Sequence, residues 1–216
     1  MAKIIWLSHI LNSKTPAYGD NGSFQIKSDK SLSQGDSCNT VNLCFSNHLG
    51  THVDAPKHFI QEGKTVDNYL AEEWVFESPL LLDVKANPGQ IIEPKDIEVK
   101  HKNDKTDLLL IRTQFEQYRE SEIYWKENPG ISPELAVHLI NLFPSLQAIG
   151  LDTISLSSYQ HRQVGRLAHQ AFLNKGLRIF EDLALAKVNN LQQVIALPLR
   201  FADADGAPCS VVGWEK

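Results

Sequence analysis

Residues 46–59 contain the side chains best able to do chemistry in this chain. They place three histidines and a carboxylate within eleven positions, at His48, His52, Asp54 and His58. The whole protein has only eight histidines. A packed core does not need such a cluster, whereas a metal site does, because nitrogen and oxygen ligands must converge within about 2.0–2.2 Å of one ion. The segment therefore predicts a site for a divalent metal.

The local sequence predicts how this site is built. His48 and His52 are four residues apart, as in a helical pair of zinc ligands. Gly50 and Pro56 argue against a helix, because both disfavour a helix interior and proline drives the residue before it toward an extended conformation. We expect a strand, a turn at Gly50 and a second extended segment. Side chains alternate along an extended chain, so His52 and Asp54 should point to the same side.

The same residues carry a family resemblance. The run His48-Leu-Gly-Thr-His52-Val-Asp54-Ala-Pro56-Lys-His58 resembles the His-x-Gly-Thr-His-x-Asp-x-Pro-x-His signature of the cyclase family, with every fixed position matched. That family includes bacterial kynurenine formamidases and isatin hydrolases. The resemblance implies that His48, His52 and Asp54 are metal ligands. It also implies that His58 is a general acid/base rather than a ligand.

A second resemblance lies in residues 165–183, which are similar to a family element with a helical histidine and a glutamate on the next strand. It implies that His169 and Glu181 complete a two-metal site. The residues agree, because 157–175 has helical character and a glycine follows it as a suitable stop. Glu181 would share a strand face with apolar residues, where a carboxylate is costly unless paired or bound to metal. Asp182 is the competing carboxylate, and an acidic pair there could instead cap a helical turn.

With these roles, the expected chemistry is hydrolysis of a small amide or ester. A divalent metal lowers the pKa of bound water to about 7 and polarises a carbonyl, and His58 could shuttle a proton to the leaving amine. Nitrogen and oxygen ligands without cysteine suit zinc and leave manganese open, with one or two ions. The resemblance implies an aryl formamide such as N-formyl-kynurenine, and hence tryptophan breakdown. A cyclic amide such as isatin, or another small amide or ester, is the alternative.

Other interpretations of the histidines remain open. A structural zinc site would usually contain cysteine and close all four positions with protein ligands. A polar loop with surface histidines, or a metal-stabilised ligand-binding protein without turnover, would leave His58 without a role. His169 taken alone is typical of packing or solvent contact. The remaining histidines have no motif context and are interpreted as ordinary polar positions: His9, His101, His138 and His161.

The tail contains one more acidic motif. Asp203-Ala-Asp205-Gly206 resembles the start of a calcium loop. It lacks the later ligands and the glutamate at position 12 of such a loop, so we interpret it as a plain turn.

Composition limits the class of protein. A length of 216 residues fits a single domain over 1–216 with a sizeable core. The net charge of −5 gives no case for nucleic acid, and the most basic stretch, 99–105, is typical of a solvated loop. Three cysteines without a C-x-x-C pair predict free thiols in a reducing compartment. The N-terminus predicts a strand rather than a signal peptide, and no apolar run approaches the ~20 residues of a membrane span. We therefore expect a cytoplasmic protein.

The fold class follows from the order of elements. Apolar and β-branched runs predict strands over residues 3–11, 40–46, 79–84, 107–112, 146–151, 177–180 and 193–199. Helices are expected over residues 132–143 and 157–175, with a short one after Pro94. The strands outnumber the helices and do not alternate with them regularly, which predicts an α/β or α+β domain with a mixed sheet and flanking helices. The cyclase resemblance implies the swivelling β/β/α fold and a homodimer or higher homo-oligomer.

A long polar segment and a set of aromatic residues bear on the choice of substrate and on subunit contacts. Residues 12–39 are polar and predict loops with an embedded hairpin, and long loops are often functional. Tyr18 stands where related formamidases carry an aromatic residue, commonly tryptophan, that lines the substrate pocket. Tyrosine departs from that pattern and leaves the exact substrate open. An aromatic group is expected in the core or at a subunit interface rather than in a ligand site: Phe115, Tyr118, Tyr124 and Trp125.

Overall fold

The computed structural model describes residues 3–20, 24–99 and 103–216. Among these residues the largest element is a nine-stranded mixed sheet. Its strands are, in spatial order, β5 (Val75–Phe76), β12 (Leu191–Pro198), β13 (Gly206–Glu215), β4 (His52–Asp54), β11 (Arg178–Glu181), β10 (Ala148–Leu151), β8 (Leu108–Arg112) and β6 (Pro79–Asp83), with β1 (Lys3–Trp6) also paired to β13. The α/β class with a mixed sheet is therefore confirmed.

Smaller elements surround this sheet. Two-stranded pairs form between β2 (Gln25–Lys30) and β3 (Thr40–Cys44), and between β7 (Ile91–Ile92) and β9 (Gly130–Ile131). The helices are α1 (Ile123–Lys126), α2 (Glu134–Leu142) and α3 (Arg162–Leu173). Short 3-10 helices span Tyr18–Asp20, Leu32–Gln34, Pro56–His58, Val66–Asn68, Ala71–Trp74, Pro94–Asp96, Phe115–Tyr118 and Tyr159–His161.

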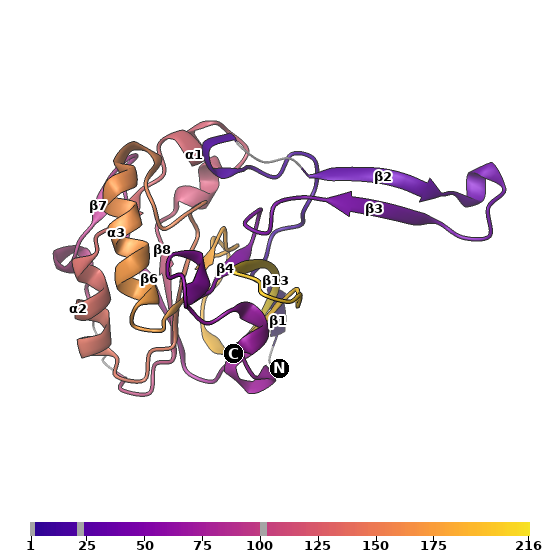
Figure 1. Cartoon of the computed structure of the whole chain (residues 1–216). Helices are drawn as coiled ribbons and strands as arrows, with labels where there is room; N and C mark the ends of the chain where they lie inside the picture. The colour runs from indigo at the N-terminus through magenta and orange to yellow at the C-terminus, as the bar shows by residue number, and fades with distance from the viewer. Residues whose placement is uncertain (1–2, 21–23, 100–102) are drawn as a thin grey trace.

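The sheet has a parallel half and an antiparallel half. Strands β6, β8, β10 and β11 run parallel, whereas β4 is antiparallel to both β11 and β13. Helices α2 and α3 lie side by side and cover one face of the parallel half (Figure 1). Leu109 and Ile111 of β8 pack beneath these helices, while Leu108 and Leu110 pack in the core on the other face. A parallel strand buried on both faces needs such a continuous apolar run.

Strand β4 joins the two halves, and all three of its residues are buried. Val53 points into the core beneath the antiparallel half. Because side chains alternate along a strand, His52 and Asp54 emerge together on the opposite face. The predicted ligands thus lie at the centre of the sheet.

A hairpin projects far from this body (Figure 1). Strands β2 and β3 pair in antiparallel register, with Ile26 opposite Leu43 and Ser28 opposite Val41. Every residue of both strands is exposed. The long polar segment thus supplies β2 of this hairpin, and the second strand, β3, coincides with the strand predicted over residues 40–46.

Several element boundaries differ from the sequence-based expectation. The first strand ends at Trp6 rather than residue 11, because Ser8 contacts Val211 of β13 through its hydroxyl and bridges through its backbone to Leu183. The helix predicted from residue 157 begins at Arg162, because the Asn128 side chain binds the carbonyls at positions 155 and 157 and holds that segment as a loop.

Strands β2 and β13 were not predicted as separate strands. In β13, glycine and proline dilute the apolar pattern, and at Gly213 the Leu191 side chain packs where a Cβ would lie, 2.6 Å from it. His101 and part of the basic stretch over 99–105 lie outside the described residues.

Two simpler expectations can be checked directly. Cys38, Cys44 and Cys209 are all free. Within the described ranges, no helix has both the length and the apolar character needed to cross a bilayer.

Candidate metal centre

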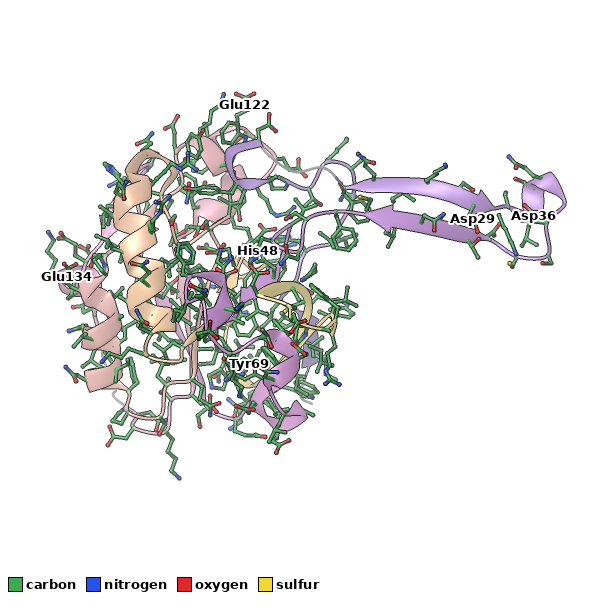
Figure 2. The ribbon with its side chains drawn as sticks, viewed as in Figure 1. Asp29, Asp36, His48, Tyr69, Glu122 and Glu134 are labelled. Carbon is green, nitrogen blue, oxygen red and sulfur yellow. The ribbon has the colours of Figure 1, made fainter. Side chains whose placement is uncertain are left out.

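Six predicted side chains converge at the centre of the sheet. His52 and Asp54 come from β4, and Glu181 comes from the neighbouring strand β11. The others arrive from flanking segments: His48 from the turn before β4, His58 from the short 3-10 helix after it, and His169 from α3. Figure 2 labels His48 inside the body, where the chain approaches β4, far from Asp29 and Asp36 on the hairpin.

Local backbone geometry explains how β4 delivers its residues. Gly50 has φ 70°, a left-handed conformation that glycine adopts without strain. The chain therefore turns at Gly50 and enters β4 extended, as expected. In the antiparallel register Glu181 stands directly opposite His52 and Ile179 opposite Asp54. Directly opposed residues share a face of the sheet, so Glu181 joins the two ligands of β4.

The inner cluster alternates imidazoles with carboxylates. His52 Nε2 lies 3.3 Å from Glu181 Oε2 and 3.5 Å from Asp54 Oδ1. His169 Nε2 lies 3.3 Å from Glu181 Oε1 and 3.4 Å from Asp54 Oδ2. All four residues are at most 3% exposed. Two buried carboxylates this close require compensating positive charge.

The Nδ1 atoms of His52 and His169 are already hydrogen-bonded to main-chain carbonyls. His52 Nδ1 is 2.7 Å from the carbonyl oxygen of Gly50, and His169 Nδ1 is 2.9 Å from that of Gly165. A carbonyl can only accept, so each Nδ1 carries a proton and each Nε2 faces the carboxylates. Metal-binding histidines are oriented in this way, with the second nitrogen donating to a carbonyl or carboxylate. The donor set and its orientation therefore fit a divalent cation.

Protons are the alternative source of positive charge in this cluster. Burial lowers the pKa of His169, but hydrogen bonding to Asp54 and Glu181 outweighs burial and raises the pKa to about 10. Burial and the charge of Asp54 raise the pKa of Glu181, but hydrogen bonds from His169 and His52 lower it to about 2. Binding a cation would therefore release protons from the histidines.

Glu181, not Asp182, faces the cluster. Glu181 Oε1 also accepts from the Leu156 amide at 2.6 Å and from Ser155 Oγ at 3.1 Å, which orients the carboxylate. Asp182 has φ 52° and turns away. It forms a bidentate ion pair with Arg119, at 2.8 and 2.7 Å.

An outer group flanks the buried cluster. His48 Nδ1 is 2.8 Å from Asp54 Oδ1, and the ring of His58 lies 4.0 Å from that of His48, centroid to centroid. Potential ligand atoms of His48, Asp54 and His58 lie within 4.8 Å of one another, as do those of His52, Asp54 and Glu181. Asp54 thus belongs to both groups and could bridge two ions.

Asp205 was not predicted as a member of this site, although it follows a turn at residues 202–203, as expected. Its Oδ2 is 3.0 Å from His48 Nε2 and 2.9 Å from His58 Nδ1. Hydrogen bonds from His48 and His58 hold the pKa of the Asp205 carboxyl well below its usual range. No sequence spacing reveals this contact, because Asp205 and His58 are 147 positions apart.

Aromatic residues stand beside the cluster. Tyr18 donates to the Ser158 carbonyl at 3.4 Å, and its ring centroid is 5.6 Å from that of Tyr159, which in turn is 5.4 Å from that of Trp125. Burial raises the pKa of Tyr18 to about 12.

The predicted aromatic group is divided between core and surface. Phe115 and Tyr124 are buried together with Ile154, as expected for core residues. Tyr18, Tyr118 and Trp125 pack against this small core and remain partly exposed.

Sequence comparison identifies a family. The Cyclase model, described as "Putative cyclase", matches residues 5–158. A curated relative, the kynurenine formamidase of Bacillus thuringiensis (strain Al Hakam), is 28% identical over 209 residues, which cover 95% of this chain and 94% of the relative.

Solved structures show the same fold at lower identity. Isatin hydrolase A from Labrenzia aggregata, bound to benzyl benzoate, superposes with a TM-score of 0.83 at 23% identity, covering 99% of this chain and 94% of that one. A structure described as a potential metal-dependent hydrolase with cyclase activity gives a TM-score of 0.78 at 19% identity, over 100% and 99% of the two chains.

Proposed function

The chain belongs to the Cyclase family, and from this premise we propose that it is a metal-dependent hydrolase of small amides. One observation carries the proposal: the buried Nε2 atoms of His52 and His169 both face the carboxylates of Asp54 and Glu181 at 3.3–3.5 Å. Such a donor set suits a divalent cation. The similarity to a kynurenine formamidase and the shared fold with an isatin hydrolase support the reaction class.

The ligands are assigned as two overlapping sets. His52, Asp54, His169 and Glu181 would hold one ion, and His48 together with Asp54 would contribute to a second. We propose zinc, since nitrogen and oxygen donors without thiolate suit it, with manganese as the alternative. A divalent ion bound there would supply Lewis-acid polarisation of the carbonyl and lower the pKa of the attacking water to about 7.

His58 is proposed as the general acid/base. Its Nδ1 is held by Asp205 at 2.9 Å, and within the described part of the chain its Nε2 has no hydrogen-bond partner. Nε2 is therefore free to take a proton from the attacking water and to deliver it to the leaving amine. Proton transfer through His58 would complete the cleavage without requiring a further protein group.

We propose an aryl formamide such as N-formyl-kynurenine as the substrate, and hence a role in tryptophan breakdown in the cytoplasm. Phe59 stacks on His169 with ring centroids 4.6 Å apart, and Tyr18, Tyr159 and Trp125 contact one another; such aromatic surfaces suit a flat ring. Three free cysteines agree with a reducing compartment. The second candidate is a cyclic amide of the isatin type, favoured by the fold shared with isatin hydrolase A over nearly the whole chain.

We further propose that residues 1–216 form one catalytic domain that acts as a homodimer. The two hydrophobic cores lie on opposite faces of one sheet, which supports a single domain. Ile26, Val41 and Leu43 share one face of the projecting hairpin and are 52–57% exposed. An isolated two-stranded hairpin is marginally stable in water, so this apolar face favours contact with a second copy.

Metal exchange tests the proposed reaction. The protein is stripped with a chelator, reloaded with zinc or manganese, and assayed with N-formyl-kynurenine and isatin. We expect turnover only after reloading, and none in His52→Ala; His138→Ala, on the distant helix α2, is the control. Turnover by the fully stripped protein would contradict metal dependence. Hydrolysis of isatin alone would favour the second candidate.

A further inference from the structure

One carboxylate oxygen serves two histidines of the site. Asp205 Oδ2 accepts from His48 Nε2 at 3.0 Å and from His58 Nδ1 at 2.9 Å. Its other oxygen, Oδ1, accepts from Asn47 Nδ2 at 2.7 Å. Both oxygens are therefore engaged, and the carboxylate cannot turn without losing hydrogen bonds.

The backbone around Asp205 is anchored to the strand that carries the ligands. The Asp205 carbonyl accepts from the Ala55 amide at 2.9 Å, and Gly206 pairs in register with Asp54. Gly206 also lets the ring of His48 pack closely, because a Cβ at that position would lie 2.3 Å from His48 Cε1. The position of Asp205 relative to β4 is thus determined by main-chain contacts as well as by its side chain.

This arrangement determines which nitrogen of each histidine carries a proton. A carboxylate accepts hydrogen bonds, so the nitrogen facing Asp205 is the protonated one in a neutral ring. Both ring nitrogens of His48 face carboxylates, because Nδ1 lies 2.8 Å from Asp54 Oδ1. A cation bound beside Asp54 would displace the proton from Nδ1, and Asp205 would keep the other proton on Nε2. His58 carries its proton on Nδ1 and keeps Nε2 for exchange.

We propose that Asp205 is a positioning residue that sets the tautomers of His48 and His58 together. On the proposed function, on which this inference rests, His48 thereby offers Nδ1 to the metal and His58 offers Nε2 for proton transfer. A carboxylate behind a ligating histidine orients the ring and raises its basicity. A carboxylate behind a general base holds the imidazole in the productive tautomer. Asp205 performs both tasks with one oxygen, so metal retention and proton transfer depend on the same side chain.

Asp205→Asn removes the charge and keeps the shape. A carboxamide nitrogen can donate to His58 Nδ1, which would reverse the tautomer and place the proton on Nε2. The matched control is Asp203→Asn, the same change in the same turn. Asp203 has φ 58°, a left-handed conformation that asparagine tolerates.

Three readouts separate positioning from general stability. Proton–nitrogen NMR of the zinc-loaded protein reports histidine tautomers, chelator competition reports zinc affinity, and steady-state kinetics report kcat and KM. In Asp205→Asn we expect loss of the His58 Nδ1–H signal, a fall of about 10–100-fold in zinc affinity, and a comparable fall in kcat with KM within about twofold. Asp203→Asn should match the wild type in all three.

A double variant tests the coupling to His58. In a His58→Ala background, Asp205→Asn should no longer reduce the residual kcat, while zinc affinity should still fall through His48. If Asp205→Asn does not fold, Asp205→Glu retains an acceptor, and we expect wild-type tautomers with partly reduced zinc affinity. Wild-type tautomers and wild-type zinc affinity in folded Asp205→Asn would overturn the inference, as would a kcat loss of equal size with and without His58.

Failure of the proposed function would look different. If the zinc-loaded wild type hydrolyses neither N-formyl-kynurenine nor isatin, the substrate assignment fails. The tautomers and zinc affinity of Asp205→Asn still decide the positioning role, because neither measurement depends on turnover.

Discussion

His52 and Glu181 face each other across the β4–β11 pair, with His52 Nε2 3.3 Å from Glu181 Oε2. The two residues occupy directly opposed positions of the antiparallel ladder, so the sheet itself sets their separation. Asp54 stands two positions further along β4 on the same face. The proposed metal centre is therefore built on buried strands, which position ligands more rigidly than loops do.

Metal removal should lower thermal stability. A ligand that binds only the folded state stabilises it by about 2.7 kcal/mol at 100 times its dissociation constant. For a chain of this size that corresponds to a rise in Tm of about 5–10 °C. Scanning calorimetry of the chelator-treated and zinc-loaded protein checks this expectation. An unchanged Tm, with zinc binding demonstrated separately, would show that zinc binds the unfolded chain as tightly as the folded one and would argue against a preformed site.

Glu181 and Asp182 are adjacent in sequence, but their substitution should affect different properties: metal binding for Glu181 and stability for Asp182. Glu181→Gln should reduce the number of ions retained per chain, because Glu181 faces His52 and His169. Asp182→Asn should retain the metal and lose about 3–5 kcal/mol of unfolding free energy, because it breaks a buried pair with Arg119. Metal analysis and urea unfolding distinguish the two variants. Equal metal loss in both would argue against assigning Glu181 as the ligand.

His58→Ala should keep both the fold and the metal but lose most turnover. General acid/base catalysis typically contributes about 10²–10⁴-fold, so we expect a fall in kcat of that size. The measurement combines kinetics on N-formyl-kynurenine with metal analysis of the same preparation. Normal turnover in purified His58→Ala would remove His58 from the mechanism.

The hairpin should control assembly through one of its two faces. Leu43 lies on the apolar face opposite Ile26, whereas Asn42 lies on the polar face opposite Lys27. Leu43→Asp should shift the protein toward monomer, because it places a charge in the proposed subunit contact. Asn42→Asp adds the same charge to the other face and should leave assembly unchanged. Light scattering after size exclusion reports the mass, and a monomeric wild type would contradict the proposal.

Residue patterns within short segments predicted many of the strands and the arrangement around Gly50. Features that depend on contacts between segments far apart in the sequence were not predicted. The extended geometry after Gly50, and hence the shared side of His52 and Asp54, followed from residue types a few positions apart. The strands of the parallel half were predicted because burial on both faces demands continuous apolar runs, as in Leu108–Arg112. Strand β13 was missed, because its glycines and proline interrupt the apolar pattern, whereas its pairing with β1 and β4 is a contact between distant segments.

The sequence by itself determined the donor chemistry of the site, because ligand type and short-range spacing are properties of a local segment. The sequence favoured Glu181 and left Asp182 as a competitor, and the tertiary structure decided which of them faces that segment. Glu181 rather than Asp182 does so because strand register sets the side of the sheet on which each side chain emerges. Asp205 reaches His48 and His58 only because β13 pairs with β4, and no local pattern records a pairing between such distant segments.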